Sequence, residues 1–178
     1  MSPGKTALRS NRGSTAAELP LMLWVVFMVL FFPLLDLAAV CLRSTFLYLA
    51  AHSATFEAAR AKTFSVPVNG SPSAVQLASA QAQAVASSFS GITVNKVTVN
   101  IISTDVNTLS VARQSTPLTT PADSTLNTYQ IEVAVQGSLS PFFNYGSRFF
   151  GDIPGLTAPI KTTFVDRQFC ENPQGLNI

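Results

Sequence analysis

A continuous apolar run near the N-terminus dominates the hydrophobic pattern of the chain. It extends from Leu19 to Leu42 and contains a single charged residue, Asp36. A helix needs about 20 apolar residues to cross the hydrocarbon core of a bilayer, so this run predicts a transmembrane helix. A core helix of a soluble protein would show a polar face over such a length. A cleaved secretory signal is the remaining alternative, although its apolar region usually spans only about 7–15 residues.

Two prolines and the single acid interrupt this run. Pro20 is expected in the first turn of the helix, where a missing N–H is harmless. Pro33 lies in the middle of the run and cannot donate to the carbonyl of Val29, which predicts a kink there. Asp36 is expected near the membrane interface or facing a partner helix. Pro33 and Asp36 are therefore candidate positions for docking to another helix.

The helical periodicity continues beyond the run to about Lys62. Five positions recur at steps of three or four residues: Phe46, Leu49, Ser53, Phe56 and Arg60. A linker rich in proline and glycine follows at residues 66–72, and a second amphipathic helix is predicted from Ser73 to about Phe89. Its alanines favour close approach to another helix or to a sheet. The predicted apolar stripe consists of Val75, Ala78, Ala82, Val85 and Phe89.

The hydrophobic period then changes from that of a helix to that of a strand. Alternation begins at Ile92 and slips phase at Asn95 and Lys96, where a bulge would fit. Strands are predicted over residues 92–101, around 109–113, over 129–139 and over 161–170. Because strands with one apolar face need cover, the helix from Ser73 is expected to pack on them. The predicted fold class is α+β, with a small antiparallel sheet packed on one or two helices.

Aromatic side chains gather in the segment between the last two predicted strands. They are Phe142, Phe143, Tyr145, Phe149 and Phe150. One interpretation is a surface that contacts a partner or the membrane. The other is that the rings fold back to complete a core that a small sheet cannot fill. The sequence favours neither.

Charge is sparse and unevenly distributed. Charged residues make up 11% of the chain and the net charge is +2, with no basic cluster of the kind that binds nucleic acid. Lys5, Arg9 and Arg12 precede the apolar run with no acid among them. By the positive-inside rule the N-terminus is expected in the cytoplasm and the region after the run outside it.

The chain offers little chemistry for a catalytic or metal site. His52 is the single histidine, and no pair of cysteines has metal-binding spacing, so neither a metal nor a cofactor is expected. No nucleophile elbow, zinc-protease motif or phosphate-binding loop occurs, so a non-enzymatic role is expected. Cys41 and Cys170 are expected to be free thiols, with a disulfide between them as the alternative.

The residues directly before the apolar run form a recognisable segment. Arg12-Gly13-Ser14-Thr15-Ala16-Ala17-Glu18 resembles the processing site of type IV prepilins. In that family a membrane peptidase cuts after the glycine, and a glutamate occupies the fifth position of the mature chain. The resemblance implies cleavage after Gly13, Ser14 as the new N-terminus, and an assembly role for Glu18, which would offset the N-terminal amine of a neighbouring subunit.

The alanine-rich segment 50–61, with Ala-Ala-Arg at positions 58–60, is similar to the continuation found in TadE-like proteins. These are pseudopilins of the tight-adherence pilus systems. The resemblance implies a basic leader (1–13), a transmembrane and stalk helix (14–62) and a pilin-like extracytoplasmic domain (63–178). It also implies membrane lipid, other pilin-like subunits, pilus assembly proteins and a prepilin peptidase as partners, at a bacterial inner membrane. An uncleaved single-pass subunit of another envelope complex and a membrane-anchored binding module remain alternatives.

Overall fold

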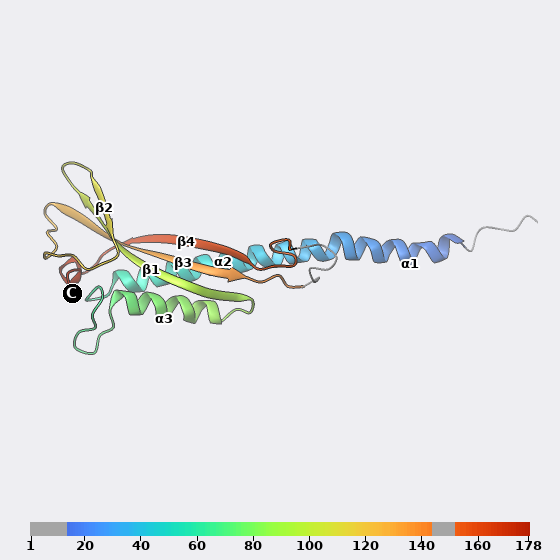
Figure 1. Cartoon of the computed structure of the whole chain (residues 1–178), viewed down its shortest axis with the longest axis horizontal. Coiled ribbons are helices and arrows are strands. Elements are labelled where there is room, and N and C mark those ends of the chain that lie inside the picture. Colours follow the sequence, from blue (N-terminus) through green and yellow to red (C-terminus); the bar gives the residue numbers. More distant parts are fainter. Residues whose placement is uncertain (1–13, 144–151) are drawn as a thin grey trace, which may run out of the picture.

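The computed structural model describes residues 14–143 and 152–178 and has an α+β fold. One long helix runs from the N-terminal side into the domain, and a second helix packs beside a four-stranded antiparallel sheet, as the sequence predicted (Figure 1). The long helix consists of α1 (Ser14–Val26), a π-helical turn η2 (Phe27–Phe31) and α2 (Phe32–Ala59). The remaining elements are α3 (Ala74–Ser87), β1 (Ile92–Asp105), β2 (Val111–Gln114), β3 (Asn127–Leu139), β4 (Ile160–Phe169) and the 3-10 turn η3 (Pro173–Gly175).

The sheet has the order β2-β1-β3-β4, and all its neighbouring strands are antiparallel. The register between β1 and β3 shifts between Val94 and Lys96, which confirms the predicted bulge. All four predicted strands are present within a few residues of their expected bounds. Helix α2 packs against β3 and β4, and α3 packs against β1. The inner face of the sheet supplies most of the large, fully buried aliphatic side chains, among them Ile101, Ile131, Val133 and Val135.

The two helices meet along a seam of alanines. On α3 the buried residues are Ala74, Ala78, Ala82 and Ala86. The predicted stripe was therefore wrong in part, since Val75 is exposed and Val85 is only partly buried. The helix is rotated so that its smallest side chains face α2, where buried positions are also occupied by alanine. Small buried side chains on both helices therefore line the contact between α2 and α3.

The periodicity of α2 located the helix but not the face that packs. Leu49, Phe56 and Arg60 of the recurring set are exposed. The packed face of the distal part of α2 instead contains Leu47 and a series of small residues: Ala50, Ala51, Ala54, Thr55, Ala58 and Ala59. The helix ends at Ala59, slightly before the predicted end.

Helix α3 begins with a capping box. The Ser73 hydroxyl accepts from the Gln76 N–H at 3.4 Å, and the Gln76 side chain accepts from the Ser73 N–H at 3.3 Å. Both groups would otherwise lack an intrahelical partner. Ser73 is fully buried, so water cannot replace the bond.

Replacing Ser73 with alanine should therefore lower the free energy of unfolding by about 1 kcal/mol. Thermal unfolding of the detergent-solubilised chain, followed by circular dichroism, measures the loss. Ser87→Ala is the matched control, because its exposed hydroxyl bonds only the carbonyl of Ala84 in the preceding turn. An equal loss in both variants would contradict the capping role.

Candidate functional site

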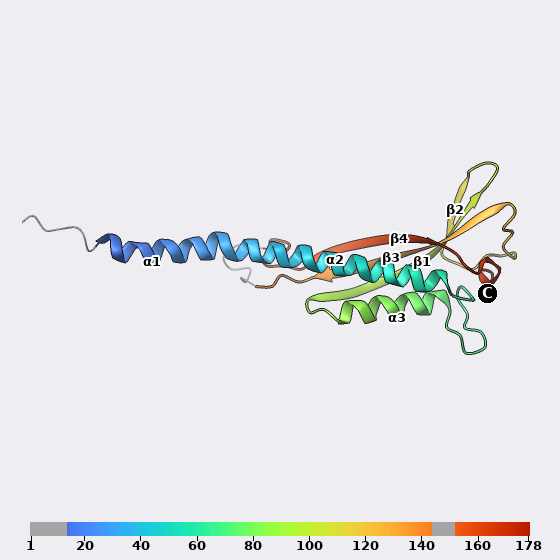
Figure 2. The ribbon, with the colours of Figure 1, turned by 180° about the vertical axis from the view of Figure 1, so that it is seen from behind.

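The first half of the long helix is bare. Every side chain from Glu18 to Phe31 is exposed, and no other part of the described chain covers it (Figure 2). The helix from Glu18 to Ala59 is long and apolar enough to cross a membrane, with a mean hydropathy of 2.6 over its most apolar stretch. A continuous exposed apolar surface of this size is unfavourable in water, and by its length and composition this helix could anchor the chain in a membrane.

The two prolines affect the helix differently. Pro20 lies inside α1 and not in its first turn, so that prediction was wrong; the helix begins earlier, at Ser14. Membrane helices tolerate such a missing bond because their surroundings satisfy the freed carbonyl. Pro33 follows the π-helical turn, in which the Phe32 N–H bonds the carbonyl of Phe27. The kink predicted near Val29 was therefore wrong: the helix has a single wide turn there and continues into α2 without a sharp bend (Figure 1).

Asp36 binds the segment that follows β3. Its side chain is fully buried, and its Oδ1 accepts from the backbone N–H of Phe143 at 2.7 Å. The Phe143 ring packs edge-on against Phe32, with the centroids 5.1 Å apart. The contact that Asp36 makes is thus within its own chain. Docking of Pro33 and Asp36 to another helix stays a prediction.

Arg43 lies about two turns after Asp36 and binds neighbouring backbone. Its guanidinium donates to the carbonyl of Ser90 at 3.0 Å and to that of Ser140, and it lies 6.0 Å from the ring centroid of Phe142. A Cβ on Gly91 would lie 2.5 Å from the guanidinium carbon, so glycine is required for this approach. We call Asp36, Arg43 and the segment Ser140–Phe143 the membrane-proximal clasp.

A second segment covers the same part of the helix. Ile153 accepts backbone bonds from Leu156 and Thr157, which closes a compact turn before β4. Between this turn and α2 lies an apolar hollow of about 260 Å³, lined in part by Pro33, Leu37 and Val40. The domain therefore begins to enclose the helix at about residue 32, well before the helix reaches the sheet.

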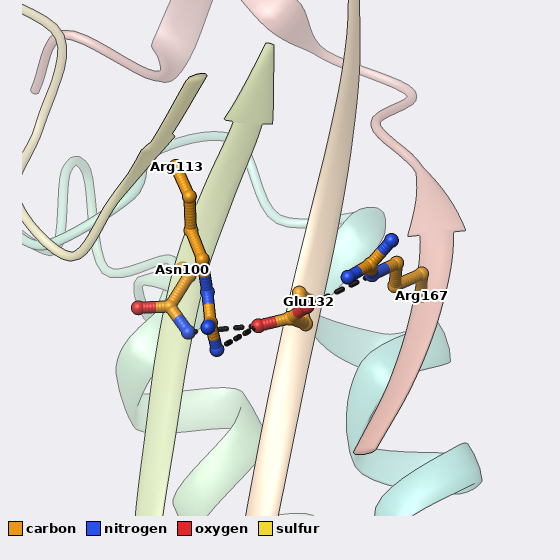
Figure 3. Close-up of polar contacts among 4 residues, drawn as sticks. All are labelled: Asn100, Arg113, Glu132 and Arg167. Atoms are coloured by element: carbon orange, nitrogen blue, oxygen red, sulfur yellow. Dashed lines mark hydrogen bonds and ion pairs between the residues drawn. The ribbon is translucent and has the colours of Figure 1, made fainter. Parts of the chain in front are cut away.

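A buried carboxylate lies on the opposite face of the sheet from the helices. Glu132 in β3 is 1% exposed and joins three other strands (Figure 3). Its Oε1 accepts from the Asn100 amide of β1 at 3.0 Å and from Arg113 of β2, and its Oε2 accepts from Arg167 Nε of β4 at 2.8 Å. Both arginine side chains are more than half exposed to solvent, whereas the Glu132 carboxylate between them is excluded from it.

The other carboxylates have local structural roles. Asp105 accepts hydrogen bonds from the backbone N–H groups of Thr108 and Asn107, both at 2.8 Å. These bonds lower the pKa of its carboxyl group, and the bond from Thr108 has the larger effect. Bonds from the hydroxyl and N–H of Thr125 lower the pKa of Asp123 in the same way. Each acid thereby stabilises a turn.

The helix α2 is also fixed to β4 by polar side chains. His52 Nδ1 lies 2.8 Å from Asp166 Oδ2. Arg60, at the end of the helix, lies 3.5 Å from Glu171. The first contact joins α2 to β4, and the second joins the residue that follows α2 to the segment after β4. No group of His, Cys, Asp or Glu within the described residues has the arrangement of a metal site.

Both cysteines are free, as the sequence predicted. Cys170 follows β4 near the distal end of α2, where the adjacent Glu171 N–H bonds the carbonyl of Ala59. Cys41 lies 18 residues earlier on the same helix, a rise of about 27 Å, which is too far for a disulfide within one chain. Burial raises the pKa of the Cys170 thiol, so it remains protonated at neutral pH.

The structure brings some of the predicted site residues together and separates others. Ser14 begins α1, and Glu18 lies in the bare part of the helix. Phe143 is partly buried against the helix, whereas Phe142 is 64% exposed, so the described aromatics divide between the two interpretations. The processing residue Gly13 and the aromatics Tyr145, Phe149 and Phe150 lie outside the described residues.

Sequence reasoning missed the clasp arginine and the cluster on the outer sheet face. Arg43 stands directly after the apolar run, where no role was predicted for it. Its spacing of seven residues from Asp36 was the available signal, since such positions lie on one side of a helix. Glu132 alternates with the apolar residues Ile131 and Val133, which by itself predicts the face away from the core, and nothing local indicated that Arg113 and Arg167 would bury it.

Comparisons with known proteins returned no match: none among protein-family models, none among curated proteins and none among solved structures.

Proposed function

We propose that this chain is a TadE-like pseudopilin, a membrane-anchored structural component of a tight-adherence, type IV-like pilus or secretion assembly. The observation that carries the proposal is the exposed apolar part of the long helix, which Glu18 precedes, four residues after Ser14 and five after Gly13. An apolar rod of this length fits a bilayer before assembly and a bundle of like helices afterwards.

The arrangement of the domain supports this proposal. The distal half of the long helix packs into the domain, while its proximal half projects from it (Figure 1). A subunit built in this way presents its apolar helix for packing and its sheet domain for outer contacts. The pilin-like layout implied by the sequence resemblance has the same plan.

The mechanism follows from the cost of a charge in an apolar bundle. A carboxylate among packed apolar helices is expensive unless a cation neutralises it. Cleavage after Gly13 would create an amine at Ser14 four residues before Glu18. Pairing of Glu18 with the amine of a neighbouring subunit would offset the charge and fix the register between subunits. In this proposal the N-terminus faces the cytoplasm and the domain faces the periplasm or the exterior.

Processing is tested by intact mass. In cells that carry a prepilin peptidase, the purified chain should lack residues 1–13, and Gly13→Ala should leave it full length, because the added side chain blocks the peptidase's approach to the backbone. Full-length protein in such cells would overturn the proposal. So would normal cleavage of the Gly13→Ala variant. A stable full-length chain would favour the alternative of an uncleaved subunit of another envelope complex.

Assembly is tested with Glu18→Gln. The variant should insert in the membrane as well as the parent chain but enter assemblies about tenfold less, equivalent to ~1.4 kcal/mol per contact. Crosslinking in cells, followed by quantification of subunit ladders, measures this. Glu57→Gln is the matched control, on the same helix but within the domain-packed half. Unchanged assembly of Glu18→Gln would exclude the charge-pair role.

A further inference from the structure

The position of the membrane-proximal clasp along the helix has a consequence for the lipid bilayer. Glu18 is the last charged residue before the bare apolar surface. Phe32 lies 14 residues further along the helix and Asp36 lies 18 residues further, at rises of about 21 and 27 Å. A hydrocarbon core is about 30 Å thick. With Glu18 at one boundary of the core, both residues lie inside the opposite leaflet.

The chain segments bound to these residues must lie at the same depth. Phe143 contacts Phe32 and bonds Asp36, so its backbone is drawn below the outer boundary of the core. Arg43, at a rise of about 37 Å from Glu18, lies beyond that boundary and holds the carbonyl of Ser140. The chain from Ser140 to Phe143 therefore descends from the headgroup region into the outer edge of the hydrocarbon.

We propose that the membrane-proximal clasp and the turn around Ile153 are immersed in the outer leaflet, so that the domain binds a phospholipid surface as well as being tethered to it. This inference rests on the part of the proposed function that has the helix span a membrane. Its partner is the lipid at the boundary between acyl chains and headgroups.

The exposed side chains of this region suit such a partner. Phe142 is 64% exposed and Ile153 is 44% exposed, although both lie close to the helix. Beside Phe142 lies a second hollow of about 300 Å³, and its lining is almost wholly apolar. The other lining residues are Leu35, Ala38, Ala39 and Leu42. This hollow offers an apolar surface for contact with an acyl chain, and Arg43, beyond the boundary of the core, lies at the level of a lipid phosphate. Aromatic and cationic residues prefer this interfacial depth.

Several backbone polar groups at this depth have partners within the protein. Irregular backbone enters hydrocarbon only where its polar groups have partners in the protein. Asp36 accepts the N–H of Phe143, Arg43 donates to the carbonyl of Ser140, and Pro141 has no N–H to satisfy. The N–H of Ile153 bonds Thr157 Oγ1 at 2.7 Å. This gives a physical reason for an aspartate within the apolar run: it carries the acceptor that the descending segment needs.

Tryptophan quenching by brominated lipids tests the inference. Trp24 is the single tryptophan of the chain and lies in the bare helix. The full-length chain is reconstituted in phosphatidylcholine vesicles whose acyl chains carry bromine near the headgroup, at mid-chain or near the methyl end. In the parent protein, quenching of Trp24 shows whether the apolar helix lies in the bilayer. In the double variant Trp24→Phe/Phe142→Trp, quenching of the new tryptophan shows whether the membrane-proximal clasp lies in the bilayer.

The matched control combines Trp24→Phe with Phe169→Trp. Phe169 is 65% exposed, almost the same as Phe142, but it lies at the far end of β4. The Phe142→Trp variant should lose most of its emission, most strongly with bromine near the headgroup, and the control should lose none. If Phe142→Trp is quenched no more than the control while Trp24 is quenched, the inference is wrong and the span stands. If Trp24 itself is not quenched, both the span and the inference fail.

Discussion

Replacing Glu132 with alanine should lower the free energy of unfolding by about 3 kcal/mol. The carboxylate is the centre at which side chains from β1, β2 and β4 meet on β3. Its removal eliminates two charge-assisted contacts and leaves the Asn100 amide, itself buried, without its acceptor. Loss of the carboxylate costs the two guanidinium groups less free energy, because both arginine side chains are more than half exposed and can bind water instead.

The separate arginine variants should show the asymmetry of the cluster. Arg113→Ala and Arg167→Ala should each cost about 1 kcal/mol, because Glu132 keeps one arginine and water reaches the vacated side. Thermal unfolding of the full-length chain in detergent gives all these values. Glu132→Gln keeps the shape and the Asn100 contact, so a loss as large as that of Glu132→Ala would assign the stabilisation to charge. Equal losses for Glu132→Ala and the single arginine variants would contradict a central role for the carboxylate.

Enlarging the alanine seam should also destabilise the domain strongly. Ala78 is fully buried where α3 faces α2. Ala78→Leu adds three carbon atoms where the helices already touch, so they must separate or tilt, at a cost of about 2–3 kcal/mol. The loss should appear as a lower unfolding temperature in the same circular dichroism assay.

Ala84→Leu provides the control for this substitution. It makes the same chemical change on the same helix, but Ala84 is exposed. Its effect should stay within about 0.5 kcal/mol, since surface substitutions rarely exceed that. Similar losses at both positions would mean that the helix propensity of leucine, and not the packing of the seam, decides the result.

Much of the architecture follows from periodicity alone. The apolar run, the second helix and four strands were predictable because the repeat of apolar positions differs between helix and strand. The bulge was predictable for the same reason, since a phase slip in strict alternation requires an extra residue on one strand. These are local properties, and the backbone geometry expresses them wherever the segment lies.

The packed faces of the helices were not predictable in the same way. Hydrophobicity favoured Phe56, Leu49 and Val75, yet these side chains are exposed and alanines are buried in their place. The distance between α2 and α3 decides which face is used, and that distance belongs to the assembled domain. At close approach small side chains pack better than large ones, so the most hydrophobic face is not the most buried.

The long helix formed by α1, η2 and α2 shows the same division. By itself, the sequence determined that an apolar helix forms over residues 19–42 and that it is long enough for a bilayer. Only the tertiary structure decided what Asp36 does, because its bond to Phe143 joins residues separated by 107 positions in the chain. The same holds for Arg43 with Ser140 and for Glu132 with its arginines. Local periodicity fixes where elements form, whereas the partner of a buried charge is set by which distant segments the fold brings within hydrogen-bonding distance.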